Sequence, residues 1–255
     1  MKQALLAVSF GTSVATARES ISAVERALSG AAPERDFFRA FTSPTIRRIW
    51  QRRGEVIASM EEALEQLAAD GYDDVIVQPT HLLYGIEYDR MAAEAHSSAT
   101  RFEKFTLGAP LVANNDDLLS LAACIEARHV PASPDHALVL VGHGTPHYAN
   151  MVYPALQTAL RLDGVENAFV GTIEGWPDAD AVLRQLAAGR YRRATLVPLM
   201  LVAGDHALND MAGDEPDSWK SRLEAVDICV DCHMQGLGLL DGVQRMYAAH
   251  LRERL

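Results

Sequence analysis

The sequence is poor in cysteine and contains no long uninterrupted run of apolar residues. Three of its 255 residues are cysteines, too few for a disulfide framework in a chain of this length, and this favours a reducing compartment. No apolar run approaches the ~18 residues that a membrane-spanning helix needs. Residues 1–17 have the outline of a signal peptide, but Ser9 and Gly11 interrupt the apolar run, which is also one copy of an internal repeat. We therefore expect an unprocessed, cytoplasmic protein without a membrane partner.

Basic residues are also in deficit. The chain has 23 Lys and Arg against 34 Asp and Glu, a formal net charge of −11. Because no basic stripe is present, a nucleic-acid partner is disfavoured. The phosphate-binding patterns G-x-x-x-x-G-K-[ST] and strand-to-helix G-x-G-x-x-G are absent, so nucleotide-dependent chemistry has no support. A small anionic ligand stays compatible with this balance, since it needs only a local cluster of Arg or Lys.

Two blocks of the sequence occur twice. Residues 64–85 and 183–204 differ in number by 119 throughout, and nine of their 22 positions are identical. Residues 4–12 (ALLAVSFGT) match residues 137–145 (ALVLVGHGT) with an offset of 133. This self-similarity indicates one duplicated unit, and therefore two similar lobes related by a pseudo-two-fold axis.

Apolar runs alternate with amphipathic segments along the whole chain, a pattern typical of the α/β class with parallel sheets and helices on both faces. The sequence predicts strands over 3–9, 36–41, 75–83, 105–107, 137–141, 168–173, 196–202 and 226–230. It predicts helices over about 15–28, 88–99, 116–128, 179–188, 219–225 and 239–255, with further helices beginning near Ser43-Pro44 and Val56. Pro131 and Pro134 mark the expected link, which gives lobes 1–130 and 131–255, with the last helix free to pack back on the first lobe.

Polar side chains follow several predicted strands at the end where open α/β sheets bind ligands. His143, Glu174 and His206 do so in the second lobe, and the repeat pairs Phe10 with His143 and Glu87 with His206. Two imidazoles and a carboxylate suit a divalent ion such as cobalt, nickel, iron or zinc. A lone histidine is more often structural, but matched placement in two lobes favours a site.

Other patterns carry less information. The segment Cys229–His233 matches the C-x-x-C-H pattern of haem c attachment, which we interpret as chance because such attachment accompanies export. His147 follows His143 by four residues and could support it or face solvent. Four arginines, Arg47, Arg48, Arg52 and Arg53, lie on one predicted helix, where a solvated face is favoured over a docking patch for carboxylates.

Together, SFGTS, FRAFTS, the GHG after the fifth strand and PLMLVAGDHALNDMAGD resemble the anaerobic cobalt chelatases, the sirohydrochlorin cobaltochelatases of cobalamin synthesis. The resemblance spans essentially the whole chain, and AGDHALNDM is its most specific part. It implies the chelatase fold, with two Rossmann-like lobes around a cleft. It also implies a lyase that inserts Co²⁺ into a tetrapyrrole and needs no cofactor beyond that substrate metal, with Fe²⁺ or Ni²⁺ as alternatives.

By motif, the resemblance implies that His143 and His206 bind the metal and accept protons. Glu174 would be the third metal ligand, and Glu87 an acidic catalytic residue across the cleft. We expect the substrate to be bound by Phe10, Gly11, Thr12 and Tyr84. The expected partners are the tetrapyrrole and the divalent ion, and association into a homo-oligomer is compatible with the sequence. Three rival hypotheses remain: iron or nickel insertion, a non-catalytic tetrapyrrole or metal carrier, and a structural protein with incidental histidines.

Overall fold

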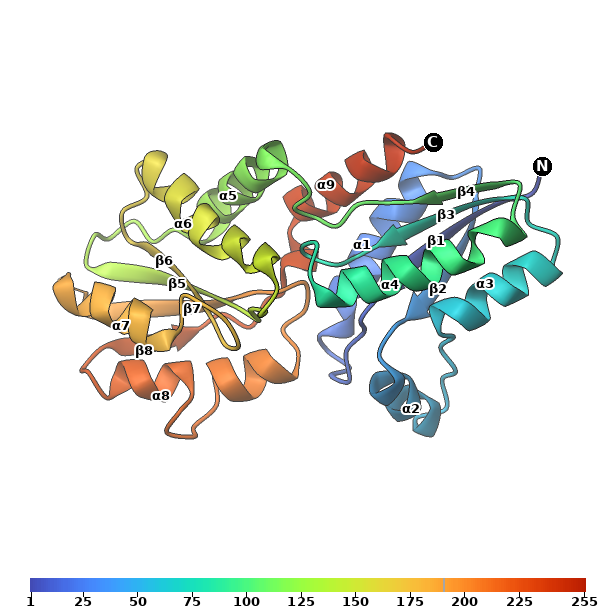
Figure 1. Ribbon diagram of the computed structural model, residues 1–255. Coiled ribbons are helices and arrows are strands. Elements are labelled where there is room, and N and C mark those ends of the chain that lie inside the picture. The colour runs from blue at the N-terminus through green and yellow to red at the C-terminus, as the bar shows by residue number, and fades with distance from the viewer. Residues whose placement is uncertain (190) are drawn as a thin grey trace. The chain divides into compact units, whose positions relative to one another are not determined.

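The computed structural model describes residues 1–189 and 191–255, which form two compact units of similar construction (Figure 1). Unit 1 comprises Met1–Ala113 and Val243–Leu255, and unit 2 comprises Asn114–Gly242. Within the described residues, each unit contains one four-stranded parallel sheet. The prediction of an α/β protein with two similar lobes is confirmed.

The boundaries between the two units lie at 113/114 and 242/243, whereas the sequence predicted a single boundary at 130/131. Helix α5 (Asn115–His129) packs on α6 (Val152–Leu162) and groups with unit 2. Helix α9 (Asp241–Arg252) begins in unit 2, and from Val243 onward it belongs to unit 1. In that unit, the Tyr247 hydroxyl donates to the carbonyl of Thr80 at 2.8 Å.

The sheet of unit 1 has the strand order β2-β1-β3-β4. Its strands are β1 (Gln3–Ser9), β2 (Asp36–Phe41), β3 (Asp74–Pro79) and β4 (Lys104–Leu107). Its helices are α1 (Arg18–Ala31), α2 (Pro44–Arg52), α3 (Met60–Ala69), α4 (Ile86–Ser98) and the short η1 (Ala99–Arg101). Figure 1 shows α4 in front of this sheet and α1 behind it.

Unit 2 repeats the order as β6-β5-β7-β8. Its strands are β5 (His136–Gly142), β6 (Ala168–Thr172), β7 (Arg193–Leu199) and β8 (Cys229–Cys232). Its remaining helices are α7 (Ala179–Ala188), α8 (Trp219–Glu224), η2 (Tyr148–Met151), the π-helical turn η3 (Ala207–Met211) and η4 (Leu237–Leu239). Figure 1 shows α5 and α6 on one face of the sheet and α7 and α8 on the other.

Strands β3 and β7 both end earlier than their apolar runs predict. In unit 1, the carbonyls of His81 and Leu82 accept from the backbone N–H groups of 111 and 112, each at 2.9 Å. In unit 2, the carbonyls of Met200 and Leu201 accept from 237 and 238 at 2.9 and 3.0 Å. The chain therefore leaves the sheet at Pro79 and Leu199, because a returning segment supplies the hydrogen bonds that a neighbouring strand would otherwise supply.

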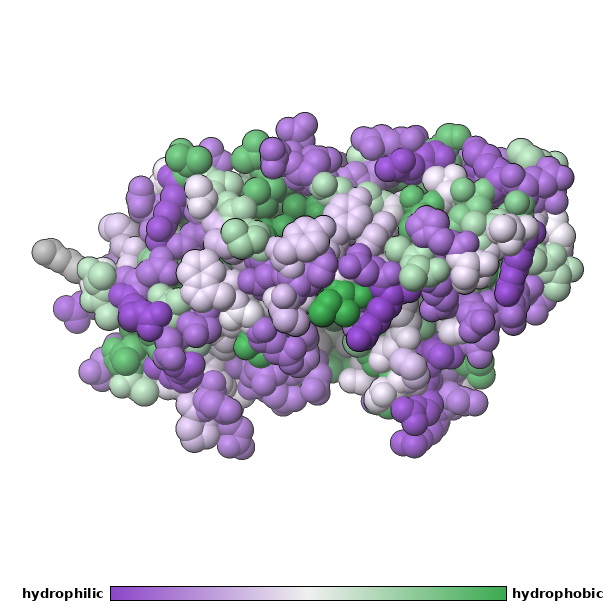
Figure 2. All heavy atoms as spheres, viewed as in Figure 1, coloured by the Kyte–Doolittle hydropathy of each residue, from purple (hydrophilic) through white to green (hydrophobic). Residues whose placement is uncertain are grey.

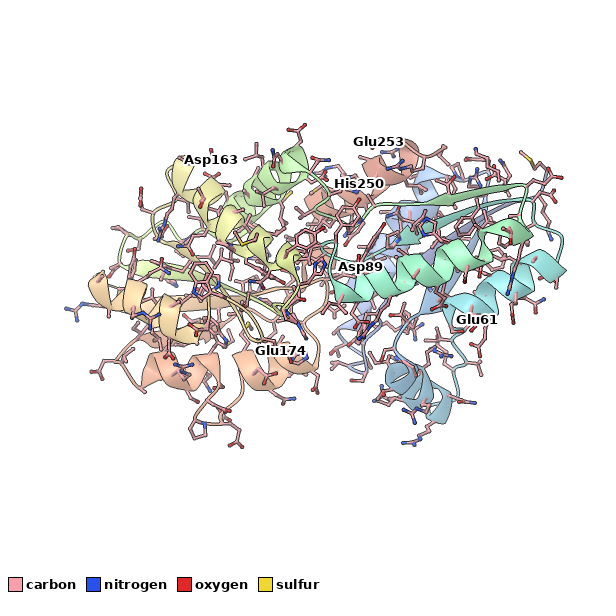
Figure 3. The ribbon with its side chains drawn as sticks, in the orientation of Figure 1. Glu61, Asp89, Asp163, Glu174, His250 and Glu253 are labelled. Atoms are coloured by element: carbon pink, nitrogen blue, oxygen red, sulfur yellow. The ribbon has the colours of Figure 1, made fainter. Side chains whose placement is uncertain are left out.

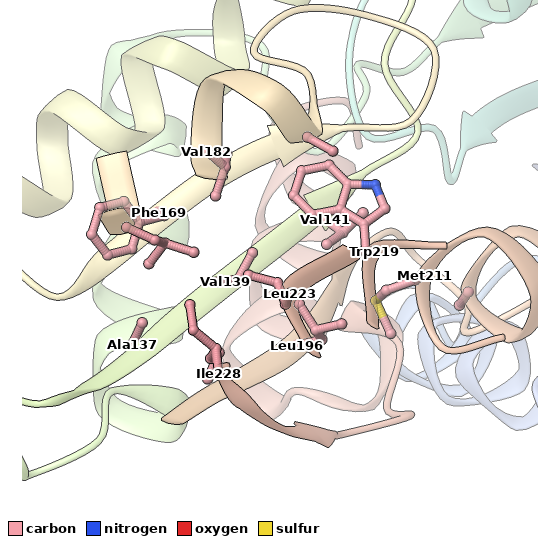
Figure 4. Packing of buried hydrophobic residues seen from close by; sticks show 14 of the residues in the cluster. Ala137, Val139, Val141, Phe169, Val182, Leu196, Met211, Trp219, Leu223 and Ile228 are labelled. Atoms are coloured by element: carbon pink, nitrogen blue, oxygen red, sulfur yellow. The ribbon is translucent and has the colours of Figure 1, made fainter. Parts of the chain in front are cut away.

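The core of unit 2 lies between its sheet and the α7–α8 layer (Figure 4). Val139, Val141 and Leu196 point from the strands toward Trp219 and Leu223 of α8, and all five are at most 4 % exposed. Each such side chain contributes about 1.5–3 kcal/mol when it is fully buried. The rigid sheet fixes the strand ends from which the candidate site is built.

The face of the protein drawn in Figure 2 is mostly polar. Figure 2 shows hydrophilic residues over most of the visible face, with hydrophobic residues scattered among them. Among the described residues, no helix has both the length and the apolar character needed to span a bilayer.

Candidate metal centre

Three neighbouring strands of unit 2 bring His143, Glu174 and His206 together. His143 follows β5, Glu174 follows β6 and His206 follows β7, and β5 lies between the other two strands. Because all three strands are parallel, their carboxyl ends meet at one edge. One ligand atom from each residue lies within 4.8 Å of the other two. Glu174, labelled in Figure 3, extends from the loop after β6.

Backbone hydrogen bonds extend the β5–β6 pairing beyond the strands. The N–H of Glu174 donates to the carbonyl of His143 at 2.7 Å, and the N–H of Ile173 donates to Gly142 at 3.0 Å. Gly144 has φ +82°, and a Cβ there would lie 2.5 Å from the nitrogen of Gly175. Glycine is therefore required where the His143 loop passes the Glu174 loop.

The two imidazoles face each other through their Nε2 atoms, which are 3.1 Å apart, with the rings perpendicular. The Nδ1 of His143 lies 2.9 Å from the carbonyl of Gly144, and the Nδ1 of His206 lies 2.8 Å from the Oδ2 of Asp210. The side chains of His143, Glu174 and His206 are 45 %, 56 % and 40 % exposed, so a diffusing ion can reach them.

This donor set fits a divalent ion that can exchange. Two nitrogens and one carboxylate suit cobalt, nickel, iron and zinc alike. Three protein ligands leave coordination positions open, whereas closed structural sites usually have four, often with cysteine. The described residues yield no other group of three or more potential metal ligands.

Two residues that the sequence did not single out brace the loops. The Asn150 Oδ1 accepts from the Thr145 N–H at 3.1 Å, while its Nδ2 donates to the carbonyl of Trp176. Tyr153 is buried on α6, and its hydroxyl accepts from the Gly144 N–H at 3.3 Å. Asn150 and Tyr153 carry no sequence signal of their own, because only the fold brings them beside the loops.

The other predicted site residues belong to unit 1. Phe10, Gly11 and Thr12 follow β1, and Phe10 is 47 % exposed whereas Thr12 is buried. Trp50 donates its indole N–H to the carbonyl of Thr12 at 2.7 Å, which anchors this loop to α2. The structure thus divides the predicted set between two units, with the three predicted metal ligands in unit 2.

Tyr84 lies two residues before α4, and Glu87 lies within it. The Tyr84 ring meets that of Tyr88 edge-on, with centroids 4.7 Å apart. Glu87 is in the first turn of α4 and pairs with Arg90 at 3.0 Å, and its side chain is 45 % exposed. A cavity of about 380 Å³ in unit 1, beside β2 and α3, is lined by none of the predicted site residues.

The arginines of α2 mostly have partners within unit 1. Arg47 pairs with Glu62 at 3.0 Å, Arg53 donates to the Ser13 carbonyl at 2.6 Å, and Arg48 bonds to its own helix through Thr45 and Pro44. These contacts agree with the solvated-face interpretation of Arg47, Arg48 and Arg53.

The C-x-x-C-H segment forms β8 and its exit. Its two thiols are free; Cys229 is exposed, whereas Cys232 packs against the core of unit 2. Because side chains alternate along a strand, the two thiols face opposite sides of the sheet. His147 accepts from the Ala149 N–H at 3.2 Å and caps η2.

Comparison with known proteins gives the family. The family model described as cobalt chelatase (CbiK) matches residues 3–255. The chain belongs to this cobalt chelatase family. A sirohydrochlorin cobaltochelatase of Salmonella typhimurium is 40 % identical over 260 residues, covering 100 % of this chain and 97 % of the relative. A second cobalt chelatase relative, sirohydrochlorin cobaltochelatase CbiKC of Nitratidesulfovibrio vulgaris, is 37 % identical, with coverages of 83 % and 76 %.

Solved structures agree with the cobalt chelatase assignment at the level of the fold. SirB from Bacillus subtilis with Fe³⁺ has a TM-score of 0.67 at 18 % identity, covering 99 % of this chain and 95 % of that one. SirB from the subspecies spizizenii in complex with cobalt has a TM-score of 0.63 at 17 % identity, with the same coverages. The expected family and chelatase fold are both confirmed.

Proposed function

We propose that this protein is a sirohydrochlorin cobaltochelatase, a lyase that inserts Co²⁺ into sirohydrochlorin in anaerobic cobalamin synthesis. The grouping of His143, Glu174 and His206 at one sheet edge carries the proposal. Full-length similarity to a relative named for this activity supports the choice of substrate. The reaction exchanges one Co²⁺ for two pyrrole protons and changes no oxidation state, so the proposal requires no redox partner or nucleotide.

The three ligands play two parts in the proposed mechanism. Glu174 and the two imidazoles hold the ion through donors that exchange readily and leave positions open for pyrrole nitrogens. As the ion moves to the macrocycle, the imidazoles lose their metal, and the ring nitrogens thus freed can accept the pyrrole protons. Their partial exposure gives these protons a path to solvent.

The unit 1 residues keep their predicted roles within the proposal. Glu87 relays protons, while the backbone near Gly11 and Thr12 and the rings of Phe10 and Tyr84 bind the substrate. The exposure of Phe10 and of the Glu87 side chain supports these assignments, because both groups are accessible to a ligand. A cytoplasmic location and a homo-oligomer remain predictions.

The decisive experiment is anaerobic mixing of the protein with sirohydrochlorin and Co²⁺, following the absorption change on metallation against a control without enzyme. We expect many turnovers per protein molecule, and their loss in His143→Ala and His206→Ala. Stoichiometric binding without turnover would identify a carrier instead. Parallel runs with Fe²⁺ and Ni²⁺ determine the preferred metal, and faster insertion of either would replace cobalt in the proposal.

A further inference from the structure

Asp210 contacts one of the metal ligands across a single helical turn. His206 immediately precedes η3, a π-helical turn, and Asp210 lies four residues later. The Oδ2 of Asp210 is 2.8 Å from the Nδ1 of His206. An ionised carboxylate only accepts hydrogen bonds. The hydrogen of the neutral imidazole must therefore be on Nδ1, which leaves a lone pair on Nε2.

The same reasoning assigns the tautomer of His143. Its Nδ1 lies 2.9 Å from the carbonyl oxygen of Gly144, which also only accepts. When both rings are neutral, each thus has its hydrogen on Nδ1, and the two Nε2 atoms, 3.1 Å apart, have no hydrogen between them. Two lone pairs at this separation repel each other, and a cation between them removes the repulsion. The tautomers therefore prepare this position for a positive charge.

The two tautomers are fixed by different means. A backbone carbonyl, itself held in the loop that crosses Gly175, fixes the ring of His143. The ring of His206 depends on a side chain, and that side chain is 46 % exposed. His206 is therefore the ligand whose orientation one substitution can release.

We propose that Asp210 is a positioning residue that holds the His206 ring and its Nδ1–H tautomer so that Nε2 faces the metal. The inference rests on the proposed function for its consequences, but the geometry itself belongs to unit 2 alone. Asp210 does not belong to the group of three metal ligands. It acts through His206, as carboxylates commonly act on metal-bound imidazoles.

The first test is Co²⁺ binding by calorimetry without tetrapyrrole. Loss of such an orienting partner typically weakens metal affinity about 10–100-fold, and we expect a loss of this size in Asp210→Ala. Asp210→Asn keeps an acceptor oxygen and should bind more tightly than the alanine variant. Asp205→Asn is the matched control, since it removes one exposed carboxylate beside His206 and should leave affinity unchanged. Equal loss in Asp205→Asn and Asp210→Asn would reduce the effect to net charge and overturn the proposal.

The second test is the tautomer, read from the ring nitrogen shifts of ¹⁵N-histidine by NMR, with His206→Gln used for assignment. We expect Nδ1–H in the wild type and a shift toward Nε2–H in Asp210→Ala. A purely structural role would lower stability without moving this signal. If His206 has the same tautomer and Co²⁺ affinity with and without Asp210, the proposal is wrong.

These outcomes separate the inference from the proposed function. A wild type that binds Co²⁺ but never metallates sirohydrochlorin would refute the enzymatic function and leave the Asp210 inference standing. Turnover by the wild type with an unchanged His206 tautomer in Asp210→Ala would support the enzymatic function and refute the Asp210 inference.

Discussion

At the carboxyl ends of their first strands, the two sheets have similar backbone conformations but different side chains. Strand β1 ends at Ser9 and is followed by residues 10–12, and β5 ends at Gly142 and is followed by the matching residues 143–145. Gly11 and Gly144 occupy equivalent positions and both have positive φ, +95° and +82°. The residue before each glycine is a phenylalanine in unit 1 and a histidine in unit 2. Duplication thus supplied one loop twice, and a single residue determines whether it presents a ring carbon or a ring nitrogen.

The amino-terminal ends of the strands also carry different side chains in the two sheets. Asp74, the first residue of β3, is fully buried and accepts from both Arg35 and Gln3. Its counterpart, Arg193 of β7, forms an ion pair with Asp231 in which both side chains are 58 % exposed. Equivalent strand positions therefore carry a buried pair in one unit and a solvated pair in the other, with different consequences for stability.

The largest expected effect comes from the pair His206 and Glu87, which the repeat relates. His206→Ala should abolish Co²⁺ binding and lower metallation by about 10²–10⁴-fold, the usual contribution of a proton-transferring group. Glu87→Gln should leave Co²⁺ affinity unchanged and lower turnover alone. Calorimetry and the metallation assay measure the two quantities separately. Loss of metal affinity in Glu87→Gln would show that both units contribute ligands.

The next comparison concerns stability. Asp74→Ala leaves the buried Arg35 without its carboxylate, and breaking a buried pair in this way costs about 3–5 kcal/mol. Asp231→Ala disrupts only an exposed pair and should leave the denaturation midpoint almost unchanged. Urea unfolding of both variants measures the difference. Equal midpoints would mean that the Asp74 pair contributes no more than the surface pair.

Acid should weaken unit 1 through the same carboxylate. Burial alone would raise the pKa of Asp74, but hydrogen bonds from Arg35 and Gln3, together with the charges of Arg35 and Lys104, outweigh it and hold the pKa below its usual value. The stabilisation is therefore complete above the unfolded pKa of ~3.9 and is lost as the pH falls through the lower folded value. Urea midpoints between pH 6 and pH 3 should fall more steeply for the wild type than for Asp74→Asn. Parallel pH profiles would contradict this assignment.

The smallest effect is expected at Tyr153. Tyr153→Phe removes one acceptor from the buried Gly144 N–H and should cost about 1 kcal/mol of unfolding free energy. Because the ring remains and the loop keeps its other contacts, Co²⁺ affinity should change little. Phe169→Leu, a substitution in the core of unit 2 away from this loop, serves as a control for the loss of stability alone. A large loss of metal affinity in Tyr153→Phe but not in the control would assign the hydroxyl a role in shaping the site.

Much of the fold could be predicted because the chain repeats itself. The offset of 133 places β5 at His136 from β1 at Gln3, and the offset of 119 places β7 at Arg193 from β3 at Asp74, as observed. The ends of β3 and β7 were harder to predict, since the apolar runs continue past Pro79 and Leu199 into segments whose backbone hydrogen bonds are made with returning loops. Helix α6 had no clear counterpart among the predicted elements, and the grouping of α5 with unit 2 depends on packing.

Sequence alone determined the residue types of the candidate metal centre and their places after successive strands, because hydrophobic periodicity and internal repeats can both be read from the order of amino acids. Only the tertiary structure showed that His143, Glu174 and His206 converge, and that Asp210 contacts the ring of His206. Strand order sets which loops become neighbours, and the pitch of a helical turn sets which side chains meet. Strand order depends on contacts between residues far apart in the chain, which the order of amino acids records only indirectly. The His206–Asp210 contact is local, but it depends on a π-helical turn that the sequence pattern did not predict.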